Sequence, residues 1–158
     1  MGGLPKRPWH DGPNVARNPG ARVILVDTCV LLDLSTQDPK WFDWSLRQIT
    51  HFGSTDTLVY NPVIYAEAGV GLPRQKELDE RFSGWHFDVF DKEVSWRASK
   101  AHTGYRARGG RRARVLGDFW IGAHAEVRGW RLLTRNPADF NDFVLGKNLI
   151  HPGHHDAK

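Results

Sequence analysis

The chain has 158 residues, of which 40% are hydrophobic and 25% are charged, with a formal net charge of +4. This length predicts a single domain, and this composition excludes a disordered, collagen-like or membrane-spanning chain. A lone cysteine, Cys29, excludes an internal disulfide and a cysteine zinc cluster, and no apolar signal segment follows Lys6 and Arg7, so we expect a cytoplasmic protein without membrane association.

The first third of the chain predicts an arm, a strand and a helix. Residues 1–21 are rich in Gly and Pro and should form a flexible arm. The apolar run at residues 22–27 is typical of a strand that is buried on both faces of a parallel sheet. Asp38 and Pro39 then predict the start of a helix, with an acceptor at the N-cap and Pro at the first helical position, and this helix should end near Gly53.

The middle of the chain repeats this alternation. Residues 57–60 predict a second strand, and Asn61 with Pro62 predicts the capped start of a helix that carries Glu67. Pro73 marks the start of a further helix.

A basic stripe follows in the second half of the chain. Residues 86–90 alternate like a short strand, and Asp91 caps the next predicted helix. Residues 97–114 then contain seven Lys and Arg and no acid, which leaves 15 basic against 18 acidic residues elsewhere. Such a stripe is either a solvated helix face or a surface that binds nucleic-acid phosphates. We predict nucleic-acid contacts from five of its arginines, which are Arg106, Arg108, Arg111, Arg112 and Arg114.

The end of the chain completes the predicted fold. Small residues at 116–129 favour a buried helix, and residues 131–134 and 148–151 predict two strands. Strands that alternate with helices predict a three-layer α/β/α domain over residues 22–152, with a mostly parallel sheet of four to five strands. A disordered tail is expected at residues 153–158.

Three acids stand in apolar segments, where solvation does not require them: Asp27, Glu67 and Asp118. Asp27 is expected at the carboxyl end of a strand, which is where open sheets bind ligands. Each repelling pair of carboxylates costs on the order of 3 kcal/mol at ~5 Å and an effective dielectric of ~20, and a divalent cation removes this cost. Oxygen ligands favour Mg²⁺, with Mn²⁺ as the alternative. Without a cation, Asp27 could cap a turn, Glu67 could pair with an arginine, and Asp118 could lie in the first turn of a helix.

Four segments of the chain, in this order, resemble the PIN-domain ribonucleases and especially the toxins of the VapC type. The segments read VDTCVLLDL, PVIYAEAGVG, LGDFWIGAHA and LLTRNPADF, and the resemblance covers about residues 22–152. It implies a metal-dependent endoribonuclease with the predicted fold, and it puts Asp27, Glu67 and Asp118 at the acidic metal positions of the family. It also implies a homodimer and a cognate antitoxin that inhibits the enzyme.

The sequence departs from the family pattern at a fourth position. Asn136 stands where the family often has an aspartate, and we expect it to be a site residue that binds the cation or holds a water. It gives the site one negative charge fewer, so a second metal should bind weakly or only with substrate, and Asp139 is a less favoured substitute for it. Thr28 and Thr134 are expected to support the carboxylates through hydroxyl hydrogen bonds. Cys29 is interpreted as a packing residue, because no histidine motif accompanies it.

The expected mechanism is hydrolysis of an RNA phosphodiester by water that a divalent cation activates, with the cation held by Asp27, Asp118 and, directly or through water, Glu67. Two other functions remain open. A catalytically inactive module that binds nucleic acid or an antitoxin is favoured by Asn136. An aspartyl phosphotransferase would use Asp27 as its nucleophile, but Cys29 stands where a second acid is required.

Overall fold

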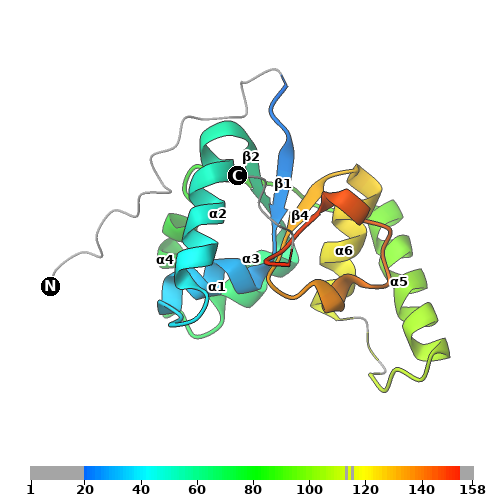
Figure 1. Cartoon of the computed structure of the whole chain (residues 1–158). Helices are drawn as coiled ribbons and strands as arrows, with labels where there is room; N and C mark the ends of the chain where they lie inside the picture. The colour runs from blue at the N-terminus through cyan, green and yellow to red at the C-terminus, as the bar shows by residue number, and fades with distance from the viewer. Residues whose placement is uncertain (1–19, 113, 115, 154–158) are drawn as a thin grey trace, which may run out of the picture.

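A computed structural model describes residues 20–112, 114 and 116–153 of the chain (Figure 1). Within these residues, five parallel strands form one sheet in the order β3-β2-β1-β4-β5. The strands are β1 (Val23–Val26), β2 (Thr57–Tyr60), β3 (His86–Phe87), β4 (Arg131–Leu133) and β5 (Leu149–Ile150). The predicted α/β class and strand number are therefore confirmed. The predicted arm at 1–21 and tail at 153–158 lie almost entirely outside the described residues.

The centre of the sheet is formed by the first apolar run of the chain. β1 lies between β2 and β4, with Ile24 opposite Leu58 and Leu25 opposite Leu132. The side chains of Ile24, Leu25 and Leu132 are fully buried, which is expected for a strand with helices on both of its faces.

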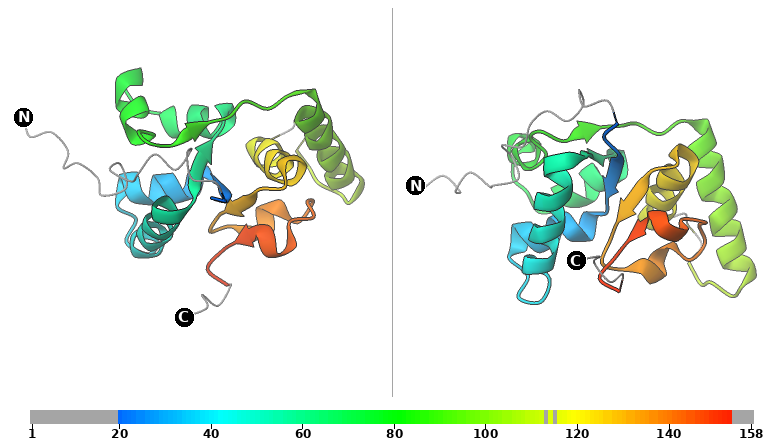
Figure 2. Two further views of the ribbon diagram at one scale, coloured as in Figure 1. Left: turned by 90° about the horizontal axis from the view of Figure 1, so that it is seen from above. Right: turned by 45° about the horizontal axis from the view of Figure 1, so that its top comes forward.

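In the part of the chain that the structure describes, six α-helices cover the two faces of this sheet. They are α1 (Thr28–Thr36), α2 (Phe42–Thr55), α3 (Pro62–Gly69), α4 (Gln75–Arg81), α5 (Lys92–Ala107) and α6 (Gly117–Arg128). Helices α1, α2 and α4 lie on one side of β1, and α5 and α6 lie on the other (Figures 1 and 2). The strand order reverses at β1, and right-handed crossovers in opposite directions place their helices on opposite faces. The point of reversal, between β1 and β4, is where such folds bind ligands.

Three helix ends follow the sequence signals. The Asn61 side chain accepts a hydrogen bond from the Ile64 amide at the start of α3, and Asp91 accepts from two amides at the start of α5. Gly129 adopts the left-handed conformation that ends α6, with φ at +66°.

Two features of the first helical layer differ from the prediction. Helix α1 was not expected, because its nine residues directly follow β1 and their apolar run does not distinguish a strand from a helix. Helix α2 begins at Phe42, later than the predicted start at Asp38. Asp38 instead accepts hydrogen bonds from the amides of Lys40 and Trp41, so it closes a turn before the helix.

None of the helices in the described part of the chain is both long enough and apolar enough to cross a membrane.

Candidate active site

Three different elements bring the predicted acids to the same edge of the sheet. Asp27 directly follows β1, Glu67 lies on α3, and Asp118 lies in the first turn of α6. Helix α3 packs against both α1 and α6, so it bridges the two helical layers at this edge. The acids influence one another electrostatically, since the charge of Glu67 raises the pKa of both Asp27 and Asp118.

Asp27 is a buried carboxylate that is held by two neutral donors. Its Oδ2 accepts a hydrogen bond from Thr134 Oγ1 at 2.7 Å and from Cys29 Sγ at 3.2 Å. The Asn136 amide donates to Thr134 Oγ1 at 3.0 Å, so the hydroxyl proton is directed to Asp27. Burial raises the pKa of Asp27, and the hydrogen bonds from Thr134 and Cys29 oppose this effect. Asp27 occupies the N-cap position of α1, but its side chain makes no capping hydrogen bond.

Glu67 is held between a hydroxyl group and the start of α6. Its Oε2 accepts a hydrogen bond from Thr28 Oγ1 at 2.5 Å. Its Oε1 lies so close to Gly117 that a Cβ atom at this position would clash with it. The alternative that an arginine pairs with Glu67 does not hold among the described residues, where the hydrogen-bond donor to this carboxylate is the hydroxyl of Thr28.

Asp118 is a half-buried acid whose pKa lies well above the ordinary value of an aspartate. Its pKa is raised to about 7, first by burial and then by the charges of Asp27, Asp139 and Glu67. The charge of Arg112 lowers this pKa and so opposes the shift. Four acids therefore share one region of negative potential, and Asp139 contributes to it.

The donor chemistry of this region fits a hard divalent cation. Among the described residues, no three Asp, Glu, His or Cys side chains converge into a preassembled metal site. Mg²⁺ does not need one, because it usually binds one or two carboxylates and retains several waters. Asp27 and Asp118 offer oxygen donors. After burial, the charge of Asp27 is the next cause that raises the pKa of Asp118, and a bound cation would offset this repulsion between the two carboxylates.

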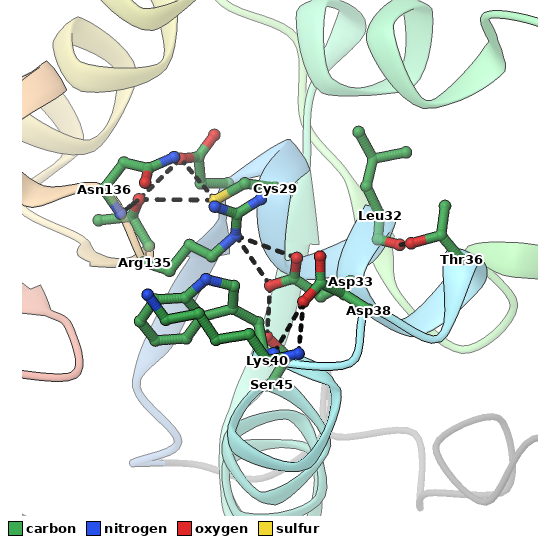
Figure 3. Close-up of polar contacts among 12 residues, drawn as sticks. Cys29, Leu32, Asp33, Thr36, Asp38, Lys40, Ser45, Arg135 and Asn136 are labelled. Atoms are coloured by element: carbon green, nitrogen blue, oxygen red, sulfur yellow. Dashed lines mark hydrogen bonds and ion pairs between the residues drawn. The ribbon is translucent and has the colours of Figure 1, made fainter.

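The loop after β4 is anchored by an ion pair between the half-buried Arg135 and the buried Asp33 (Figure 3). Arg135 Nε donates to the two carboxylate oxygens of Asp33, at 3.0 and 3.1 Å, and Ser45 Oγ donates to the same carboxylate at 2.8 Å. The Arg135 guanidinium also lies 5.8 Å from the ring centre of Trp41. This pair ties the segment that contains Thr134 and Asn136 to α1 and α2, so it fixes the groups that orient Asp27.

Sequence reasoning missed the hydrogen bond that Cys29 donates to Asp27, and it missed the ion pair between Asp33 and Arg135. The interpretation of Cys29 as a packing residue omitted its hydrogen bond to Asp27. Burial, together with the charge of Asp27, raises the pKa of the Cys29 thiol, so it stays protonated and acts as a donor. The signal for Asp33 was an acid inside the apolar run VLLDL, and the signal for Arg135 was its place beside Thr134.

The basic stripe is divided by its internal contacts. Arg97 donates to Glu126 at 2.5 Å and to the carbonyl of Asp142 at 2.9 Å, and Arg108 forms an ion pair with the Asp142 carboxylate. These two arginines hold the segment after β4 against α5 and α6. Arg97 is therefore half-buried between α5 and α6 and is not part of a fully solvated face.

The other arginines of the stripe lie in the last turn of α5 and on the loop between α5 and α6. Arg106 donates to the carbonyl of Gly110 at 2.9 Å, and a ring nitrogen of His102 lies 2.9 Å from the carbonyl oxygen of Arg112. The side chains of Arg111, Arg112 and Arg114 are exposed. Because the charge of Arg112 acts on Asp118, this loop lies beside the acidic site.

Comparison with known protein families identifies the fold. Residues 24–143 match the sequence model of the PIN domain. The chain belongs to the PIN domain family. The resemblance that the four sequence segments carry is thereby confirmed at the level of the family. No curated protein matches the sequence.

Solved structures agree with the PIN fold. FitAcB from Neisseria gonorrhoeae has a TM-score of 0.60 and 18% identity, over 84% of this chain and 99% of that chain. VapBC-1 from nontypeable Haemophilus influenzae has a TM-score of 0.60 and 18% identity, over 82% and 96%. VapBC2 from Rickettsia felis, bound to a DNA fragment from its promoter, has a TM-score of 0.58 and 16% identity, over 82% and 96%.

Proposed function

We propose that this PIN domain is a divalent-metal-dependent endoribonuclease and the VapC-type toxin of a toxin–antitoxin pair. The observation that carries the proposal is the electrostatic coupling of three acids from three elements, since the charges of Asp27 and Glu67 add to burial in raising the pKa of Asp118. The similarity to a chain from a toxin–antitoxin complex of Klebsiella pneumoniae, with a TM-score of 0.60 and 18% identity, supports a cognate antitoxin as partner. A homodimer and a cytoplasmic location are part of the same proposal.

The acidic residues have separate roles in this mechanism. Asp27 and Asp118 would hold Mg²⁺ or Mn²⁺, with Glu67 binding directly or through water. When bound, the cation supplies an activated water and neutralises charge on the phosphodiester. Thr134 and Cys29 orient Asp27, and Thr28 orients Glu67.

At the fourth position of the site, the residue and its charge differ from the family pattern. Asn136 reaches Asp27 through its backbone amide and the hydroxyl of Thr134. Asp139, three residues later, adds a negative charge that acts on Asp118. We infer that Asp139 supplies part of the charge that the family aspartate would provide at Asn136.

The exposed arginines beside this site would bind the RNA strand. Arg111, Arg112 and Arg114 lie on the loop that leads into α6 and to Asp118. Arg106 and Arg108, also predicted as RNA contacts, have exposed side chains but already contact Gly110 and Asp142 within the chain. Phosphate contacts of this kind provide affinity without sequence selection.

A catalytically inactive PIN module is the second candidate function. It is favoured by Asn136 and by the lack of a preassembled three-ligand cluster among the described residues. Such a module would bind nucleic acid or an antitoxin without turnover.

RNA cleavage distinguishes the two functions. Purified protein is incubated with end-labelled RNA in Mg²⁺, Mn²⁺ or EDTA, together with the variants Asp27→Asn and Asp118→Asn. Asp43→Asn, which changes an exposed acid at the start of α2, is the matched control. We expect metal-dependent cuts from the wild type and the control, and their loss in both site variants, each shown to be folded by circular dichroism. Intact RNA in every sample, from protein free of copurified inhibitor, would establish the inactive module instead.

A further inference from the structure

A buried histidine links the helix of Glu67 to the helix of Asp118. His124 lies on α6, and its side chain is completely buried. Its Nδ1 is 3.1 Å from Nδ2 of Asn61, and its Nε2 is 2.9 Å from Oδ2 of Asp88. A buried imidazole that is fully hydrogen-bonded to two other segments fixes their relative positions.

The hydrogen bonds of Asn61 determine which nitrogen of His124 carries the proton. Asn61 Oδ1 accepts from the Ile64 amide at 2.9 Å, so the NH₂ group of Asn61 faces the histidine. Nδ1 of His124 must then be the acceptor, and the proton is on Nε2, which donates to Asp88. Burial lowers the pKa of His124, which favours this neutral form.

Asp88 connects the histidine to the start of α5. Arg128 lies 3.8 Å from the Asp88 carboxylate that accepts from His124, and 3.3 Å from the carboxylate of Asp91, the N-cap of α5. The groups that act on His124 are therefore Asp88, Arg128 and Asp91, together with the neutral amide of Asn61.

Both helices that this histidine joins carry acids of the candidate site. Asn61 caps α3, which carries Glu67, and α6 begins with Gly117 and Asp118. The two helices pack together, and Glu67 lies against Gly117 without room for a Cβ atom. Any movement of α3 along or away from α6 therefore changes the separation of Glu67 and Asp118.

We propose that His124 is a positioning residue, which holds α3 against α6 through Asn61 and thereby sets the affinity of the acidic site for a divalent cation. This inference rests on the proposed metal site. Groups that orient metal ligands typically change metal affinity by 10–100-fold when they are mutated.

Two substitutions of His124 separate its two hydrogen bonds. In His124→Asn, the amide oxygen can replace Nδ1 as the acceptor from Asn61. In His124→Gln, the longer side chain can place an NH₂ group near the position of Nε2 and keep the bond to Asp88. A third variant, Asn61→Ser, keeps an N-cap for α3 but removes the NH₂ group that reaches His124.

The readouts are Mn²⁺ affinity of the RNA-free protein by isothermal titration calorimetry and the urea unfolding midpoint. We expect His124→Gln and Asn61→Ser to bind Mn²⁺ on the order of tenfold more weakly than the wild type, whereas His124→Asn stays close to it. A purely structural histidine would lower the unfolding midpoint in all three variants and leave Mn²⁺ affinity unchanged, which would overturn this inference alone. A folded wild-type protein that binds no Mn²⁺ would overturn the proposed metal site and this inference with it.

Discussion

Two acids of the candidate site, Asp27 and Glu67, differ from other buried or half-buried acids in their hydrogen-bond partners. In the described part of the chain, Asp27 and Glu67 accept hydrogen bonds from neutral groups of Thr134, Cys29 and Thr28. By contrast, Asp33 is paired with an arginine. Glu126 and Asp142 are likewise paired with arginines of the basic stripe. Neutral donors orient a carboxylate without cancelling its charge, so Asp27 and Glu67 keep the negative potential that attracts a cation.

The raised pKa of Asp118 predicts a pH-dependent stability in EDTA. The pKa is about 7 in the folded protein against an ordinary value of 3.8, so the folded state holds this proton more tightly than the unfolded chain does. The contribution of Asp118 to stability is then complete below its unfolded pKa and is lost as the pH rises through about 7. We expect wild-type protein to lose more unfolding free energy than Asp118→Asn between about pH 5 and about pH 8 in urea titrations. Equal losses in the two proteins would show that Asp118 has an ordinary pKa.

At the scale of elements, the contact between α3 and α6 decides the shape of the site. Glycine at the start of a helix normally lowers stability, because it gives up more backbone freedom than alanine does. Gly117 has a specific reason to be glycine, since Glu67 Oε1 occupies the space of a Cβ atom. The same contact brings the Glu67 carboxylate to the residue next to Asp118. Close approach of the two helices is therefore part of the metal site that we propose.

This contact predicts that two glycine-to-alanine substitutions differ in their effect on Mn²⁺ affinity. Gly117→Ala should displace Glu67 and weaken Mn²⁺ binding by about tenfold, because the carboxylate must move away. In Gly53→Ala, on α2, the new Cβ would lie 3.5 Å from Leu58 Cδ1, which is an ordinary contact. That control should leave Mn²⁺ affinity unchanged and raise stability by about 0.5–1 kcal/mol. Calorimetry and urea unfolding measure both quantities, and equal Mn²⁺ affinity in the two variants would contradict the role of Gly117.

At the scale of the whole molecule, folding separates the basic stripe into arginines that are paired with acids and arginines for which the described residues show no ion pair. Arg97 and Arg108 reach the segment after β4 and pair with Glu126 and Asp142, which come from distant parts of the chain. Arg111 and Arg112 stay exposed on the loop beside Asp118. The charge available to RNA is thus smaller and more local than the sequence count suggests.

Salt dependence tests which arginines contact RNA. Single-stranded RNA binding is measured by fluorescence anisotropy on Asp27→Asn protein, which is expected not to cleave. Replacing Arg111 and Arg112 by Ala should reduce the slope of log affinity against log salt by about 1.4, because each phosphate contact on a single strand contributes about 0.7. Arg47→Ala, on the exposed side of α2, should leave the slope unchanged. An unchanged slope in the double variant would place the RNA elsewhere on the surface.

Local patterns in the sequence were sufficient for the architecture and for the family. The β-branched run of β1 and the caps Asn61, Asp91 and Gly129 each depend on residues close in sequence, and the structure confirms them. Helix α1 was missed because nine apolar-rich residues after a strand have no periodicity of their own. The acids Asp27, Glu67 and Asp118 were identified because a charge inside an apolar segment is visible without any structure.

The partners of those acids were decided only by the tertiary structure. Thr134 with Asp27, Arg135 with Asp33, and His124 with Asn61 are contacts between residues that are far apart in sequence. They form because the crossovers place β4 beside β1 and pack α3 against α6. The sequence by itself therefore determined which acids lie in apolar surroundings, because an acid within an apolar segment is recognisable from its neighbours in the sequence. Which neighbour satisfies each charge depends on three-dimensional proximity, and only the packed fold determines it.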